Sequence, residues 1–476
     1  MNLKRLAPAC LALLFASMLA VSCGDDDPAD PSGNTPEEPV KPEEPSDKEA
    51  LTPTQQKEKM EAVALDFMKL TPASDFENLA TLSKHINDTY VDGYYEWDDV
   101  EDWASRAYEA AKEATGLTTT EKEEGYSYLQ TYIYTHYNAL LLASNFTGHF
   151  KAAGGKWTLT KANDLQFEFN DQNGKTCVLA VKTSGKVTKV HAAELEDWID
   201  YDYEYKDGFS HYTDYIDLIH CTIGVPETIE VTLTQAGATV VKTTVNVNLS
   251  GVKNEEFDIS SSNVTAKVKV ELNNGYTIDV NDVAYTGNTK ASTTCKLSKS
   301  NTTLATMAVA ADVYDLPACN VSAFTDPTFD DDDYKFDNAG AKNAFIKLDI
   351  MGRMQIQGTV SDVRKYAEYL DEADRNDENE ASFKSYINLA NGLSDIHVFY
   401  DNSNVRQASV KWEPFYENYW GNYGYWTAEP VIYFADGSSY STFSAFFNDK
   451  DFKTVINTFK ALAEKYAGLV NEEIDW

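Results

Sequence analysis

Apolar residues recur at helical spacing after Pro53 and continue to do so to about residue 145. Positions three and four apart lie on one face of a helix, so this spacing predicts helices with one buried side. Pro53 suits a first helical turn after Thr52, because the N–H that proline lacks has no helical partner there. Four such stretches predict a helical region over 52–153. The apolar residues of the first stretch are Met60, Ala64, Phe67 and Met68.

The spacing of apolar residues changes from about 3.6 to 2 at Gly154-Gly155. Apolar and polar residues then alternate in several segments, and Asn274-Gly275 is typical of a tight turn between two strands. Alternation predicts strands with one dry and one wet face. We therefore expect a long antiparallel β-meander over 154–325, with the helices covering its dry face.

Both patterns return in the C-terminal region, 326–476. We expect a strand pair over 344–358, or one long strand bent at Gly352. Further expected strands lie near 395–401, 405–413, 429–435 and 439–447, with a hairpin turn at Asp436-Gly437. Helices are expected at 361–374, at 380–391 and from about Phe452, the last one amphipathic. The predicted class is α+β: an N-terminal helical layer, a β-meander with one covered face and a mixed C-terminal region. Whether the two β regions form one sheet stays open.

Two segments are denser in aromatic residues than packing alone requires. One runs from Trp198 to Tyr215 and the other from Trp412 to Trp426. Glycine and asparagine favour a loop for the second, and exposed rings on a loop suit a sugar or a protein partner. The alternative is that the rings cap the ends of the core. The candidate ligand-binding residues are Trp412, Tyr416, Tyr419, Trp420, Tyr423, Tyr425 and Trp426.

The charge of the chain narrows the range of partners. It has 76 acidic and 40 basic residues, for a formal net charge of −36. Such a surface repels nucleic acid and anionic lipid headgroups, and it favours divalent cations. Aromatic residues make up 12% of the chain, which separates it from disordered acidic sequences.

No catalytic motif stands out. The phosphate-binding G-x-x-x-x-G-K-[ST], the nucleophile elbow G-x-S-x-G and the zinc motif H-E-x-x-H are absent, and the seven histidines are scattered. Pairs of carboxylates can hydrolyse glycosides, but many pairs can be chosen among so many acids. An acidic run can hold Ca²⁺, although it lacks the glycine and final glutamate of an EF-hand loop. The alternative is a solvated loop, and no other cofactor is expected. This run is Asp330, Asp331, Asp332 and Asp333.

Four of the six cysteines, Cys177, Cys221, Cys295 and Cys319, lie beyond the N-terminal region, and four are too few for a disulfide framework in so long a chain. Cys177 and Cys295 lie in strand patterns and are expected to be buried thiols, with a Cys295–Cys319 disulfide as the alternative. No C-x-x-C occurs, which excludes a zinc ribbon.

The N-terminus carries features of an exported protein. Basic Lys4 and Arg5 precede an apolar stretch that is too short to span a membrane. Leu19-Ala20-Val21-Ser22-Cys23 resembles a bacterial lipobox, with Ala20 where a larger aliphatic residue is usual. A Pro- and acid-rich segment follows, so we expect a signal peptide over 1–22 and a tether over 23–51.

The whole N-terminal arrangement resembles that of Bacteroidota outer-membrane lipoproteins exposed at the cell surface. The resemblance implies that Cys23 carries the lipid and that Asp25, Asp26 and Asp27 direct export to the outer face. The lipid is then the only membrane attachment. We expect a non-enzymatic binding module for a glycan, nutrient or protein. The alternatives are a carboxylate-dependent hydrolase and a carrier that holds a hydrophobic ligand in a curved sheet.

Overall fold

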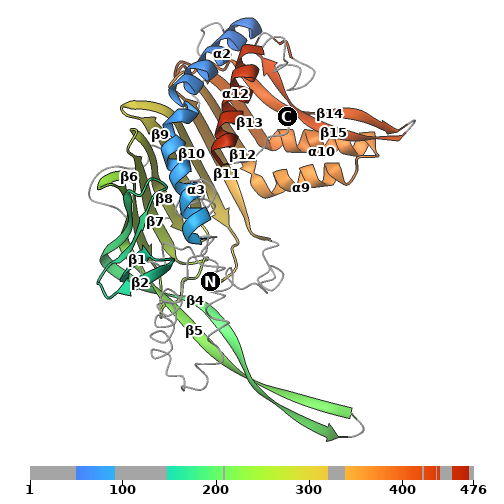
Figure 1. The fold of residues 1–476 in the computed structure, drawn as a ribbon. Coiled ribbons are helices and arrows are strands. Elements are labelled where there is room, and N and C mark those ends of the chain that lie inside the picture. The colour runs from blue at the N-terminus through green and yellow to red at the C-terminus, as the bar shows by residue number, and fades with distance from the viewer. Residues whose placement is uncertain are drawn as a thin grey trace. The chain divides into compact units, whose positions relative to one another are not determined.

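The computed structural model describes residues 50–91, 147–206, 209–319, 338–420, 423–435, 437–439 and 453–470. In these residues the chain has five α-helices and a mostly antiparallel sheet of fifteen strands (Figure 1), so the predicted α+β class is confirmed. Contacts divide the chain into two units. Unit 1 comprises Met1–Ala20, Thr81–Asn273 and Pro317–Asp337, and unit 2 comprises Val21–Ala80, Asn274–Leu316 and Asn338–Trp476.

Unit 1 contains the first seven strands, in the order β7-β6-β5-β4-β3-β1-β2. Among the described strands of this unit, β1 pairs with β3 in parallel, and the other pairs are antiparallel. The rings of Phe150 and Phe167 stack 4.9 Å apart in its core, which Leu82 of α3 (Glu77–Ile86) completes. The strands are β1 (Gly148–Ala153), β2 (Lys156–Thr160), β3 (Leu165–Asn170), β4 (Thr176–Lys206), β5 (Phe209–Gln235), β6 (Ala238–Ser250) and β7 (Asn263–Leu272).

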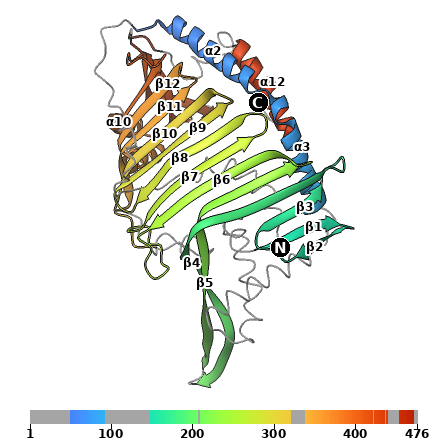
Figure 2. The ribbon, with the colours of Figure 1, turned by 90° about the vertical axis from the view of Figure 1, so that its left-hand side faces the viewer.

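Strands β4 and β5 are much longer than the pattern of the sequence predicted. They pair with each other from Cys177 and Gln235 out to Lys206 and Phe209, beyond the reach of β3 and β6. The outer part of this pair is a two-stranded ribbon that projects from the sheet of unit 1 (Figures 1 and 2). The aromatic segment Trp198–Tyr215 therefore lies on paired strands.

Unit 2 contains the other eight strands, each hydrogen-bonded to the next in the order of the sequence. Because β10 pairs with β11, the two expected β regions share one sheet. The segment 344–358 is a strand pair, as one of the two alternatives predicted. The strands are β8 (Tyr276–Thr286), β9 (Lys290–Lys299), β10 (Thr302–Tyr314), β11 (Gly340–Ile350), β12 (Met354–Asp362), β13 (Ser394–Tyr400), β14 (Ala408–Trp420) and β15 (Tyr423–Phe434).

Helix α2 (Pro53–Leu70) begins as expected, with Thr52 and Gln55 forming a reciprocal cap. Its Met60 packs in a core with apolar residues of β13, β14 and β15, and Val455 of α12 (Lys453–Val470) packs against the same core. The first residues of α2 are also held by side-chain amides. Gln56 Nε2 donates to the carbonyls of Leu51 and Gln407, 3.0 Å each, and Leu51 N donates to Gln407 Oε1 at 2.7 Å.

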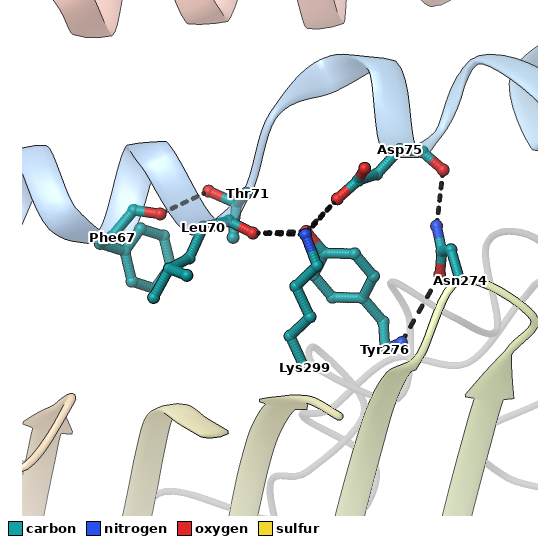
Figure 3. A network of polar contacts seen from close by, with 7 residues as sticks. All are labelled: Phe67, Leu70, Thr71, Asp75, Asn274, Tyr276 and Lys299. Atoms are coloured by element: carbon teal, nitrogen blue, oxygen red, sulfur yellow. Dashed lines mark hydrogen bonds and ion pairs between the residues drawn. The ribbon is translucent and has the colours of Figure 1, made fainter. Parts of the chain in front are cut away.

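The C-terminal end of α2 is fixed by a second polar network, drawn in Figure 3. Lys299 Nζ donates to Asp75 Oδ2 at 2.6 Å and to the carbonyl of Leu70 at 2.9 Å, where the helix has no further N–H to offer. The hydroxyl of Tyr276 lies 2.8 Å from the same carboxylate, and Asn274 Nδ2 donates to the Asp75 carbonyl at 2.5 Å. Tyr276 of β8, Lys299 of β9 and Asn274 in the turn before β8 thus hold the end of α2.

A helix pair connects β12 to β13. Helix α9 (Val363–Asp374) is capped by Asp362, and α10 (Glu380–Leu393) is capped by Asn379. These bounds agree with the two helices that the sequence predicted. Ala373, Phe383 and Ile387 form their buried core.

Several predictions fall outside the described residues. These are the signal peptide, most of the tether, the helices expected over 92–146 and most of the strand expected at 439–447. In the described part of the chain Cys295 and Cys319 are not joined by a disulfide, so that alternative is wrong. Cys177 is buried as predicted, whereas Cys295 is half-buried. Among the described helices, none combines the length and apolar character needed to cross a membrane.

Candidate ligand-binding surface

The aromatic segment 412–426 is a β-hairpin, so the prediction of a loop is wrong for the described residues. β14 and β15 pair from Ala408 and Phe434 to Trp420 and Tyr423. The glycine that suggested a loop has another role. A Cβ on Gly424 would stand 2.2 Å from the Glu417 carbonyl oxygen and 2.8 Å from the Tyr416 ring. A side chain at position 424 would therefore clash with β14, and only glycine lets the Tyr416 ring and the Glu417 carbonyl come this close.

Residues alternate between the two faces of this hairpin. We call the face with Trp412, Tyr416 and Trp426 the tryptophan face. The opposite face is the carboxylate face, with Glu413, Phe415, Glu417, Tyr425, Glu429 and Tyr433.

The tryptophan face packs on the helix pair of unit 2. Trp412 and Trp426 contact the core of α9 and α10, and Trp412 Nε1 donates to the hydroxyl of Tyr366 at 2.6 Å. Lys384 Nζ lies 4.4 Å from the centre of the Trp426 ring, a cation–π distance. These two tryptophans are therefore part of the core, which is the alternative that the sequence left open for the aromatic segment.

One side-chain amide completes the backbone hydrogen bonds of β14. The pairing of β13 with β14 ends at Ile396 and Val410, because α10 leads directly into β13. Asn391 of α10 takes the next place: its Oδ1 accepts from Trp412 N at 2.9 Å, and its Nδ2 donates to Trp412 O at 2.7 Å. The helix thus fixes the hairpin at the residue where its partner strand is lost.

The carboxylate face presents ordered polar groups to solvent. Tyr425 is 37% exposed, and its hydroxyl donates to Glu417 Oε2 at 3.0 Å. The hydroxyl of Tyr433 donates to Glu413, and burial together with this carboxylate raises the pKa of Tyr433 to about 12. Each tyrosine is thus held by a glutamate on the facing strand.

Two carboxylates of this face stand directly opposite each other, since Glu413 pairs with Glu429 in the register. Opposite side chains have Cβ atoms about 4.5–5.5 Å apart, where like charges repel. Hydroxyl donors from a ligand would stabilise such a pair. This face therefore places strong hydrogen-bond acceptors beside the exposed ring of Tyr425, which suits a ligand with many hydroxyl groups.

The remaining predicted site residues are not brought to this surface by the described structure. Tyr419, Trp420 and Tyr423 belong to the strands of the hairpin, but their side chains lie outside the described residues. Cys23, Asp25 to Asp27 and Asp330 to Asp333 also lie outside them. Within the described part of the chain, no three His, Cys, Asp or Glu side chains are grouped as a metal site requires.

The glutamates and Tyr433 were missed in the sequence because 76 acidic residues make any carboxylate pair uninformative. The only signal is the alternation Glu413-x-Phe415-x-Glu417, which becomes visible once the segment is read as a strand. Comparison of the chain with protein-family models, with curated proteins and with solved structures found no match.

Proposed function

We propose that this protein is a lipid-anchored, non-enzymatic binding protein of the cell surface, and that the carboxylate face of hairpin β14–β15 binds a carbohydrate. The observation that carries this proposal is the arrangement of Tyr425 and Tyr433 on one face, each hydroxyl held by a glutamate. Sugars combine apolar C–H faces with hydroxyl donors. An exposed ring beside carboxylate acceptors offers a partner to both.

The packing of the tryptophan face on the helix pair favours binding at the carboxylate face. Trp412 and Trp426 pack on α9 and α10, so the opposite face of the same hairpin is already ordered before a ligand arrives. A surface that is ordered in advance loses less conformational entropy on binding. Tyrosine rings add to this, because they bring a large contact area with few rotatable bonds.

The proposed cellular location of the protein is inferred from its N-terminal sequence. The proposed lipid on Cys23 and the acidic run Asp25 to Asp27 would hold the protein on the outer face of the outer membrane. Several acyl chains on one cysteine bind a membrane stably. A binding protein at that place would meet carbohydrates before they enter the cell.

Two tyrosines of the hairpin provide a matched test. Tyr425 belongs to the carboxylate face and Tyr416, 46% exposed, to the tryptophan face. With the purified full chain on a glycan array, Tyr425→Ala should weaken the binding of a hit by about tenfold, roughly the 1.4 kcal/mol of a lost aromatic contact. Tyr416→Ala should leave binding unchanged. Equal binding by the wild type and Tyr425→Ala, or no glycan hit at all, would contradict the proposal.

A second candidate is a glycoside hydrolase, and the opposed pair Glu413 and Glu429 favours it. Retaining enzymes place two carboxyl groups about 5–5.5 Å apart. The same glycan hit distinguishes the two functions: incubation with the wild type should release new reducing ends only if the protein is a hydrolase. Glu413→Gln and Glu429→Gln would each abolish this release. A glycan that stays intact supports the binding protein.

A further inference from the structure

Three Asn-Gly pairs occur in the sequence, and all of them lie in described residues: Asn173-Gly174, Asn274-Gly275 and Asn391-Gly392. Such a pair is prone to deamidation, because glycine has no side chain to shield its backbone nitrogen from the neighbouring asparagine. The three pairs share this intrinsic reactivity. Their surroundings in the fold therefore decide which of them reacts.

Deamidation at an Asn-Gly pair needs no reagent other than water. The backbone nitrogen of the glycine attacks Cγ of the asparagine, so that an N–Cγ bond forms and the bond from Cγ to the side-chain nitrogen breaks. That nitrogen leaves as ammonia with the proton of the glycine N–H, and a cyclic succinimide remains. Water then opens the ring at either carbonyl, which gives aspartate or isoaspartate. The reaction therefore requires a side-chain amide that can turn and a glycine N–H that can leave its hydrogen bond.

Asn391 meets neither requirement. Its Oδ1 accepts from Trp412 N at 2.9 Å, and its Nδ2 donates to Trp412 O at 2.7 Å. Gly392 lies within α10, whose backbone N–H groups are bonded to carbonyls one turn earlier. The amide of Asn391 cannot reach the glycine nitrogen without losing the contacts that fix hairpin β14–β15.

Asn274 is confined in a similar way. Its Nδ2 donates to the carbonyl of Asp75 at 2.5 Å, as Figure 3 shows, and its Oδ1 accepts from Tyr276 N at 3.5 Å. The space beside the glycine is also filled, since a Cβ on Gly275 would stand 2.9 Å from Ser300 Oγ. Neighbouring residues therefore restrain both reacting groups of this pair.

Asn173 meets both requirements. It is exposed in the turn between β3 and β4, and within the described part of the chain its side-chain amide has no hydrogen bond. The turn holds this pair through its backbone: Asn173 N donates to Asp171 Oδ1 at 2.8 Å, and Gly174 N donates to the Asp171 carbonyl at 2.9 Å. A Cβ on Gly174 would meet no atom within 4 Å, so the peptide unit has room to turn once the second bond opens.

From these contacts we infer that Asn173 is the deamidation site of the folded protein, and that the fold protects Asn274 and Asn391. The reaction places a new carboxylate or an extra main-chain methylene beside Asp171. Asp171 Oδ1 accepts from the backbone N–H groups of both Asn173 and Lys175, at 2.8 Å each. Isoaspartate moves these two donors apart and disrupts the turn. The modification is separate from carbohydrate binding by β14–β15, and it uses residues of unit 1 only.

Peptide mass spectrometry of the purified full chain measures the loss of the amide at each asparagine during incubation at neutral pH. A sample taken at time zero corrects for deamidation during digestion, and a parallel incubation in urea gives the rates of the unfolded chain. In the folded protein, Asn173 should react at least about tenfold faster than Asn274 and Asn391, because local opening of an exposed turn costs little free energy. In urea the three rates should come close together.

A variant of the glycine tests the attacking nitrogen. Gly174→Ala adds a methyl group that shields this nitrogen, so the loss of the amide at Asn173 should slow both in the folded protein and in urea, where folding plays no part. Gly155→Ala is the matched control, since Gly155 also lies in an open turn with positive φ, and it should leave the rate at Asn173 unchanged.

Three results would overturn the inference. One is equal rates at the three asparagines of the folded protein, and another is faster loss at Asn274 or Asn391 than at Asn173. The third is a rate at Asn173 in urea that Gly174→Ala leaves unchanged, because the reaction then does not pass through the nitrogen of residue 174.

Discussion

Asp75 illustrates how a single carboxylate fixes the end of a helix. Its side chain accepts from Lys299 and Tyr276 while its carbonyl accepts from Asn274, so α2 and two strands meet at one residue (Figure 3). Burial alone would raise the pKa of Asp75, but the hydrogen bonds from Lys299 and Tyr276 and the charge of Lys299 outweigh it and lower the pKa. The ionised form is therefore the one that stabilises the fold.

A lowered pKa makes the contribution of Asp75 depend on pH. Above the ordinary aspartate value of about 3.9 the stabilisation is fully present, and it is lost as the pH falls through the lowered folded value. At pH 7, Asp75→Asn should lower the free energy of unfolding by about 1–3 kcal/mol. The gap between wild type and variant should shrink toward pH 3.

Urea unfolding at both pH values measures this gap, at low protein concentration because the pI is about 4.4. Asp66→Asn is the control, since the ion pair of Asp66 with Arg353 is exposed and contributes little. A gap for Asp75→Asn that is the same at pH 7 and pH 3 would contradict the assigned role.

At the scale of elements, the helices were the most predictable part. The sequence predicted 361–374 and 380–391, and α9 and α10 occupy Val363–Asp374 and Glu380–Leu393. Their starts are set by local chemistry, because the side chains of Asp362 and Asn379 accept from backbone N–H groups three residues later.

The strands that were missed depend on contacts distant in sequence. The ladder of β4 and β5 shifts register between Ser184 and Val187, between His191 and Ala193, and between Trp198 and Asp200. Each irregularity breaks the strict alternation that identifies a strand in a sequence. Hairpin β14–β15 was hidden for another reason: the ring of Tyr416 over Gly424 becomes visible only in three dimensions.

Helix α10 fixes hairpin β14–β15 through Asn391, and the stability that this contact contributes can be measured. Asn391→Ala removes both hydrogen bonds to the backbone of Trp412 and leaves that N–H and C=O without their partner. The free energy of unfolding should fall by about 1–3 kcal/mol, and the near-UV circular dichroism of the tryptophans should change.

Asn246→Ala serves as the comparison, because Asn246 is exposed on β6 and its amide oxygen accepts from the hydroxyl of Thr228 instead of from a backbone group. It should stay within about 0.5 kcal/mol of the wild type. If the two variants unfold alike, Asn391 does not fix the hairpin.

At the scale of the whole molecule, the proposed anchor is the feature that decides where the protein works. Cys23→Ala should move the protein from the membrane fraction to the soluble fraction and abolish palmitate labelling, because one residue carries all acyl chains. Cys10→Ala is the matched control: Cys10 lies in the expected signal peptide, so labelling should persist. Palmitate on the Cys23→Ala variant would show that the lipid is elsewhere.

The site where the tether joins the fold has a mechanical consequence. Leu51, the last residue of the expected tether, is held by Gln407, and β14 begins at the next residue, Ala408. If a cell is pulled away from a carbohydrate bound at β14–β15, the force enters the fold at Leu51 and passes through its hydrogen bond with Gln407 into β14. Hydrogen bonds between antiparallel strands are perpendicular to the strands, so this force shears many of them at once instead of opening them one by one. Such an arrangement resists tension.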